Sequence, residues 1–121
     1  GLRDAVPLGA QRSMTAGSAA QVLLAWEEPE NLPRLLKEAT FTVLSLQQVR
    51  RRGWAQSVAE REPGVASVSA PVLSPSGKII AAVSVSGPIE RLTRQPGRLH
   101  APAVMAAAER LSEVLRRNGT E

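Results

Sequence analysis

The sequence predicts an α+β protein, in which helices pack on an antiparallel sheet. Apolar residues recur at helical spacing up to about Gly53, alternate along an extended run from Gly64, and return to helical spacing from about Ala101. A turn at residues 74–77, which contains proline and glycine, separates two alternating runs and predicts a hairpin. With 121 residues, of which 43% are hydrophobic, the chain fits one domain with a single core.

Three helices are expected before the hairpin, at residues 18–28, 32–39 and 45–52. Ser18 and Ser45 each stand three residues before a glutamine, which is the spacing of a capping box, so each is expected to cap a helix. A proline at position 29 stops the first helix by about residue 28. The third helix is expected to end at glycine 53, after three arginines that complement the negative end of the helix dipole.

The two hairpin strands are expected at residues 65–73 and 78–86. Successive side chains of a strand point to opposite faces, and each strand carries two serines that are two residues apart. Alanine, valine and isoleucine fill most of the alternate positions. The serines that we expect on one face are Ser67, Ser69, Ser84 and Ser86.

The pairing across the turn decides which serines meet. If Ser74 pairs with Gly77, Ser67 lies opposite Ser84, and a glycine bulge would shift this pairing by one residue. Four small hydroxyls suit a cavity for a small polar ligand, since each offers one donor and two acceptors without filling the space. The alternative is an ordinary solvent-facing surface, which the hairpin taken alone favours.

One short helix and one long helix are expected after the hairpin. Gly87 would cap the short helix, with Pro88 as its first helical residue. The long helix would run over residues 101–117, after a loop at 95–98. Its apolar stripe consists of Val104, Ala107, Ala108, Leu111, Val114 and Leu115.

The composition excludes several classes of chemistry. The chain has no cysteine, which excludes disulfides, thiol catalysis and cysteine-based metal sites, and Asp4 and His100 are the only residues of their types. We therefore predict no metal, no cofactor and no catalytic residue. The net charge of +4 comes mostly from scattered arginines, which is weak evidence for a nucleic-acid surface. No apolar run reaches the roughly 20 residues of a membrane helix, so we expect a cytoplasmic protein without a membrane partner.

The first predicted helix offers a second candidate site. The N–H groups of its first turn, beginning with Ala19, have no partner within a helix, and a carboxylate binds well at such a positive end. Ser18 has a structural alternative as the helix cap, and capping is the better explanation of this residue taken alone. Residues 60–62 are interpreted as a solvated charge cluster before the hairpin.

Several segments together carry a resemblance to a known family. They are MTAGSAAQVLLA (14–25), RRRGWA (50–55), EREPGV (60–65), SVSAPV (67–72) and AAVSVSGPI (81–89). With these segments, the chain resembles the effector-binding domain of the IclR family of bacterial transcription regulators over nearly its whole length. The resemblance implies a GAF-like α+β domain that binds a small organic or aromatic acid and transmits its presence to a DNA-binding domain.

The resemblance also implies which residues contact the effector. They lie at the start of the first helix, after the GWA segment and in the hairpin: Ser18, Ala19, Ser57, Ser67, Ser84 and Ser86. A family position that can be acidic is Ser57 here, and one that can be cysteine is Ser67. A site without that negative charge favours an anionic effector, a carboxylate held by hydroxyls and backbone N–H groups.

Family members also carry an N-terminal winged helix-turn-helix and further strands for which this sequence has no counterpart. Residues 1–121 are therefore interpreted as part of an effector-binding and oligomerisation domain that is truncated at its N-terminal side, with residues 1–12 as the last of those strands. The expected partners are the effector, further copies in a homodimer or tetramer, and DNA only through the missing N-terminal domain.

Two alternatives stay open. One is a dimerisation scaffold without a ligand, in which another chain covers the serine face. The other is an enzyme with Ser67 or Ser84 as nucleophile and His100 or Glu60 as base. Nothing in the spacing brings these groups together, so the enzyme is the weaker alternative.

Overall fold

The sheet and its helices are seen in a computed structural model that describes residues 2–7, 17–37, 39–60, 63–93 and 95–119. The described elements are β1 (Leu2–Pro7), α1 (Ser18–Ala25), a 3-10 turn (Pro29–Asn31), α2 (Leu32–Leu35), α3 (Val43–Arg52), β2 (Ala55–Val58), β3 (Val65–Leu73), β4 (Ile79–Pro88), α4 (Ile89–Leu92) and α5 (Pro96–Arg117). The predicted α+β class is confirmed.

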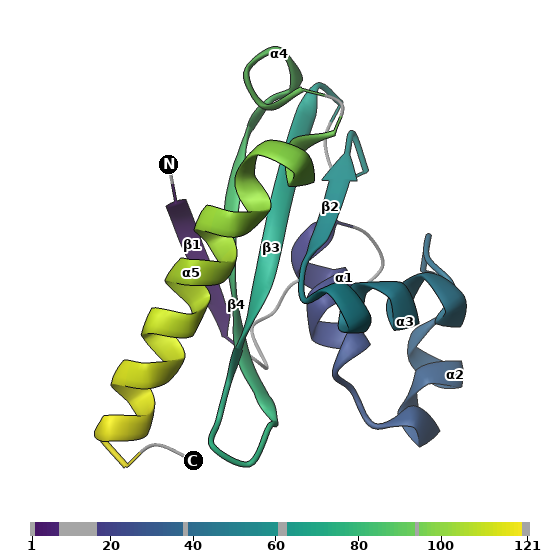
Figure 1. Cartoon of the computed structure of the whole chain (residues 1–121). Coiled ribbons are helices and arrows are strands. Elements are labelled where there is room, and N and C mark those ends of the chain that lie inside the picture. Colours follow the sequence, from purple (N-terminus) through teal and green to yellow (C-terminus); the bar gives the residue numbers. More distant parts are fainter. Residues whose placement is uncertain (1, 8–16, 38, 61–62, 94, 120–121) are drawn as a thin grey trace.

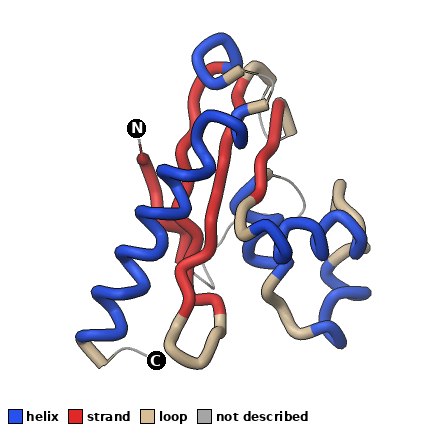
Figure 2. Tube along the Cα trace, in the orientation of Figure 1, coloured by secondary structure: helices blue, strands red, loops and turns tan. Residues whose placement is uncertain are grey.

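The described strands form one antiparallel sheet in the order β1-β4-β3-β2 (Figure 2). β3 and β4 are the predicted hairpin and form the centre of the sheet. β2 pairs with β3 along one edge, and β1 pairs with β4 along the other. The strand expected within residues 1–12 is thus present as β1, while residues 8–12 lie outside the described part.

The helices cover the two faces of the sheet separately (Figure 1). α5 packs on the face formed by alternate residues of β3, and the buried side chains there include Ala66, Val68, Ala70, Val72, Val104 and Ala108. α1 and α3 lie on the opposite face, with a core that includes Val22, Leu24, Leu46, Val49 and Ala82. The predicted alternation of β3 is therefore confirmed, because its apolar positions and its serines face opposite sides.

α3 begins two residues before its predicted start, because Thr42 and not Ser45 is its cap. The Thr42 hydroxyl accepts a hydrogen bond from the Ser45 N–H at 3.1 Å, and the Ser45 hydroxyl accepts one from the Thr42 N–H at 2.9 Å. This is a reciprocal capping box. The predicted end is confirmed, since Gly53 adopts a left-handed φ of 89° and donates its N–H to the Val49 carbonyl at 2.8 Å.

Three other helices differ from their predicted bounds. α1 ends at Ala25. Beyond this end the Glu27 N–H donates to the carbonyl three residues back, at Leu24, and not to the one four residues back as in an α-helix. α2 covers only four residues after the 3-10 turn. α4 is capped by Pro88 and not by Gly87, because β4 continues through both residues, with Pro88 opposite Val65.

α5 begins at Pro96, five residues before the prediction, because its first turn docks against β2. The Gly97 N–H donates to the Gln56 side-chain oxygen at 2.9 Å. A Cβ on Gly97 would lie 2.2 Å from the Trp54 ring, so only glycine permits this approach. The predicted stripe is confirmed except at Val114, which is 44% exposed. No described helix is long and apolar enough to span a membrane.

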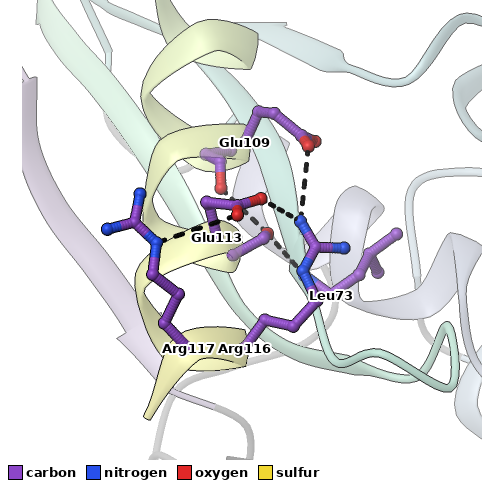
Figure 3. Close-up of polar contacts among 7 residues, drawn as sticks. Leu73, Glu109, Glu113, Arg116 and Arg117 are labelled. Atoms are coloured by element: carbon purple, nitrogen blue, oxygen red, sulfur yellow. Dashed lines mark hydrogen bonds and ion pairs between the residues drawn. The ribbon is translucent and has the colours of Figure 1, made fainter.

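α5 is also fixed to the sheet near its C-terminal end, where Leu73 of β3 lies beside it (Figure 3) and binds Ser112. The Ser112 hydroxyl donates to the Ala108 carbonyl at 2.9 Å and accepts from the Leu73 N–H at 3.1 Å. Leu73 is where the β3–β4 pairing is irregular, and the serine supplies an acceptor to its backbone N–H. Exposed ion pairs between Glu113 and Arg116 and between Glu113 and Arg117 lie on the same stretch of α5.

Candidate ligand-binding site

Five serine hydroxyls from four elements form one hydrogen-bonded chain beneath α1. In order along the chain they are Ser57, Ser67, Ser18, Ser69 and Ser84, and we call them the serine cluster. The successive Oγ–Oγ distances are 2.8, 2.6, 2.7 and 2.6 Å. The structure thus brings together four of the six residues that the resemblance implied, and it adds Ser69. The signal for Ser69 was already in the alternation of β3, which puts it on the face of Ser67.

The pairing of the strands brings the serines of the sheet together. Ser67 lies opposite Ser57 on β2, and Ser69 lies opposite Ser84 on β4. The predicted pairing of Ser67 with Ser84 is wrong, since Ser67 lies opposite Ser86. The pairing is displaced by two residues and not by one. A displacement of two keeps every side chain on its face, so the predicted gathering of serines on one face is confirmed.

The pairing of β3 with β4 shifts by one residue at each of two separate places. At the turn, the Ser74 N–H donates to the Lys78 carbonyl at 2.8 Å, so Ser74 pairs with Lys78 and not with Gly77. A second slip lies between Val72 and Leu73. A bulge at the turn accounts for only one of the two residues. Two slips of one residue each restore the original side-chain alternation.

Ser18 belongs to the cluster and does not cap α1. The N-cap is Gly17, whose φ of 95° is in the left-handed region, and no side-chain cap is formed. Ser18 is the first helical residue, is 2% exposed, and directs its hydroxyl to Ser67 and Ser69. The predicted capping box is therefore wrong. Gln21 takes no part in capping, because its side-chain amide donates to the Gln56 carbonyl at 3.1 Å.

The remaining two predicted residues border the cluster. Ala19 is the second residue of α1 and packs, partly buried, against the apolar core of that face. Ser86 lies opposite Ser67 on the serine face and is partly buried. Among the described residues, Ser86 makes no side-chain hydrogen bond to the cluster. Residues 15 and 16 of the loop before α1 lie outside the described part.

Glu60, which the sequence suggested only as a base in the enzyme alternative, binds the N-terminus of α1. Its carboxylate accepts a hydrogen bond from the Gly17 N–H at 3.1 Å, from the Gln21 side chain at 3.4 Å and from the Thr40 hydroxyl at 3.3 Å. Glu60 is exposed, as the interpretation as a solvated charge cluster implies, but it also binds these three residues; residues 61 and 62 lie outside the described part. Position 57 carries a serine and no charge, but the Glu60 carboxylate puts a negative charge at Gly17, the residue before Ser18.

The cluster lacks the partners that a serine nucleophile needs. Within the described part of the chain, no imidazole or carboxylate hydrogen-bonds to a cluster serine. His100 lies on α5, which covers the other face of the sheet, and Glu60 binds Gly17, Gln21 and Thr40 instead. The same part of the chain holds no group of three or more side chains that could bind a metal ion. The arrangement is suited to binding a polar molecule by hydroxyls.

The hydroxyls of the cluster hydrogen-bond to one another. Ser69 is completely buried and Ser57 is 5% exposed, while Ser67 and Ser84 are partly buried. A ligand that binds here would therefore have to replace hydrogen bonds between serines by hydrogen bonds to itself. A separate hollow of about 330 Å³ lies between the β3–β4 turn, α5 and the end of α3, and its wall includes Trp26 and Met105.

Comparison with known proteins gives the family. The family model described as bacterial transcriptional regulator IclR C-terminal matches residues 2–113. The chain therefore belongs to the IclR family of bacterial transcription regulators, of which it matches the C-terminal domain. The family resemblance noted from the sequence is confirmed.

Individual relatives agree with this assignment. The chain is 32% identical over 124 residues to the transcriptional regulator BhcR of Paracoccus denitrificans, an alignment that covers 92% of this chain and 44% of BhcR. It is 25% identical to KdgR of Escherichia coli, covering 87% of this chain and 45% of KdgR. The chain thus spans less than half the length of these two curated relatives. Both are transcriptional regulators by name.

Solved structures share the fold. A putative IclR regulator from Silicibacter matches with a TM-score of 0.74 at 25% identity, covering 87% of this chain and 46% of that one. The inducer-binding domain of an Acinetobacter PobR double mutant, in complex with 3-hydroxybenzoic acid, matches with a TM-score of 0.71 at 24% identity, covering 82% of this chain and 65% of that one.

Proposed function

We propose that this chain is the effector-binding domain of a transcription regulator, and that a small organic or aromatic acid binds at the serine cluster beneath α1. The observation that carries the proposal is the convergence of five hydroxyls from α1, β2, β3 and β4 at the N-terminal turn of a helix. Such hydroxyls together with the N–H groups of a helix N-terminus suit a carboxylate. Membership of the IclR family supports the regulatory role.

The residues proposed to contact the effector have distinct roles. Hydroxyls would bind its polar atoms, and the α1 backbone at Ala19 would offer an N–H group to its carboxylate. The proposed contact residues are Ser18, Ala19, Ser57, Ser67, Ser69, Ser84 and Ser86. No step of this function requires catalysis, a metal or a cofactor.

The proposed mechanism is a population shift. An effector that binds one arrangement of a homodimer or tetramer more tightly stabilises that arrangement, and this changes how the DNA-binding domains of the full regulator are spaced. DNA contact belongs to that N-terminal domain, and the regulator acts in the cytoplasm.

Calorimetry on the wild-type chain and on Ser84→Ala tests the site. We use 3-hydroxybenzoate, 3-hydroxybenzamide and a cationic benzylamine as probes, because a domain of this fold binds 3-hydroxybenzoic acid. Loss of one hydroxyl should weaken acid binding about ten- to 150-fold, since a hydrogen bond to a charged group contributes about 1.5–3 kcal/mol. Ser84→Leu, which also fills the space, should abolish binding.

The matched control is Ser76→Ala, in the exposed turn between β3 and β4. It should bind the acid as the wild type does, and melting temperatures should verify that each variant folds. Unchanged binding by Ser84→Leu would refute the site, and a preference for benzylamine would refute the acid as effector class.

A dimerisation scaffold without a ligand is the second candidate. It is favoured by the closed hydrogen bonding of the serine cluster and by large apolar side chains that are exposed on α3 and α5, namely Val43, Leu44, Leu99 and Met105. Native mass spectrometry separates the candidates. A stable oligomer that binds none of the three probes in calorimetry supports the scaffold, whereas a bound acid supports the sensor.

A further inference from the structure

The carboxylate of Glu60 connects three segments that are distant in sequence. One oxygen accepts the Gly17 N–H at 3.1 Å and the Thr40 hydroxyl at 3.3 Å, and the other accepts the Gln21 side-chain amide at 3.4 Å. Gly17 is the N-cap of α1, and Thr40 precedes α3 by three residues. The N-terminus of α1 thus already binds one carboxylate, which belongs to the chain itself.

The backbone before Glu60 directs its side chain towards α1. Ala59 has a φ of 60°, a left-handed conformation that non-glycine residues rarely adopt. Its N–H donates to the Val65 carbonyl at 2.8 Å, which closes the connection between β2 and β3. Glu60 therefore leaves the sheet at a fixed turn, and its exposed side chain returns to Gly17.

We propose that Glu60 is an internal competitor of the effector, a carboxylate that the effector's own carboxylate displaces from the N-terminus of α1. The inference rests on the proposed function. It follows from the position of Glu60, because Gly17 adjoins Ser18, whose hydroxyl is the middle member of the serine cluster. Two carboxylates at one helix terminus repel each other, so an acid binds only when Glu60 moves away.

Displacement of Glu60 has a consequence beyond the site. Its bond to the Thr40 hydroxyl breaks together with the bond to Gly17. The segment that leads into α3 thereby loses this link to the α1 terminus whenever an acid is bound. A neutral ligand of the same shape does not repel Glu60 and leaves this link in place. Glu60 thus distinguishes acids from neutral analogues and couples their binding to the start of α3.

The test compares Glu60→Gln with the wild-type 121-residue chain, using 3-hydroxybenzoate and 3-hydroxybenzamide in calorimetry. Glutamine keeps an acceptor for Gly17 but removes the charge. We expect Glu60→Gln to bind the acid about tenfold more tightly, because one like-charge repulsion is lost, and to bind the amide within about twofold of wild type. Glu28→Gln, an exposed carboxylate before the 3-10 turn, removes the same charge elsewhere and should change neither affinity.

Backbone amide NMR gives a second, independent measurement. The Thr40 signal of acid-saturated wild type should move towards its position in ligand-free Glu60→Ala, whereas the amide ligand should leave it in place. If the acid binds the wild type but Glu60→Gln behaves as Glu28→Gln does, the competitor role is wrong and the proposed function stands. If neither probe binds any of the variants, the aromatic-acid function fails and this inference fails with it.

Discussion

The two faces of the β3–β4 hairpin differ in what they contribute. Towards α5, β3 presents Ala66, Val68, Ala70 and Val72, each at most 1% exposed. Towards α1, the same strand presents Ser67 and Ser69, which bond to other serines. Full burial of a valine contributes about 1.5–3 kcal/mol, whereas a hydrogen bond between hydroxyls contributes about 1 kcal/mol net. The apolar face therefore supplies most of the stability.

This difference explains how one small sheet can combine a stable fold with a binding site. Bonds between hydroxyls can be exchanged for bonds to a ligand at little net cost, because donors and acceptors stay satisfied. Close-packed valine side chains cannot be exchanged in this way. We therefore expect substitutions of the β3 residues that face α5 to change mainly the free energy of unfolding, and substitutions of the cluster serines to change mainly ligand affinity.

The largest effect is expected from Val68→Ser, which puts a hydroxyl on the apolar face. Lost burial and an unpaired hydroxyl should lower the free energy of unfolding by about 3–4 kcal/mol in urea titrations. Ser69→Ala, the neighbouring position on the other face, should cost only about 1 kcal/mol. Val43→Ser, at an exposed position of α3, is the control and should change little. Equal losses at positions 68 and 69 would contradict the difference between the faces.

A smaller effect is expected from Ser112→Ala, which tests how α5 holds the pairing of the hairpin. Without the hydroxyl, the Leu73 N–H loses its acceptor, and the free energy of unfolding should fall by about 1–2 kcal/mol. Hydrogen exchange should become faster at Leu73. The exposed turn variant Ser76→Ala serves as the control. An unchanged exchange rate at Leu73 in Ser112→Ala would show that α5 does not stabilise the irregular pairing.

The fold class and the strands of the hairpin could be predicted because their signals are local. Alternation along residues 65–73 and 78–86 and the turn between them need no distant information. The exact pairing could not be predicted, since the slip at Leu73 is supported by Ser112, which is 39 residues away in sequence. The start of α5 also depends on residues distant in sequence, since Gly97 docks against Trp54 and Gln56. It could therefore not be predicted from the local pattern.

The candidate site was predicted as a face but not as a hydrogen-bonded cluster. The sequence around Ser18 has the pattern of a capping box, but the hydroxyl of Ser18 bonds instead to Ser67 and Ser69, which are 49 and 51 residues away in sequence. The contact of Glu60 with the N-cap at Gly17 could not be predicted, because the two residues are 43 apart in sequence and meet only in the folded chain. Short-range patterns specify which residue types face each side, while long-range packing decides which of them bond.

The most direct test of the central claim is to map amide shifts on the labelled 121-residue chain while 3-hydroxybenzoate is added. The largest shifts are expected at Ser18, Ala19, Ser67 and Ser84, whereas the buried α5 residues Val104 and Ala108 should be nearly unmoved. Saturable shifts centred on Val104 and Ala108, with the serine cluster unaffected, would contradict the assignment of the binding site to the hydroxyl face.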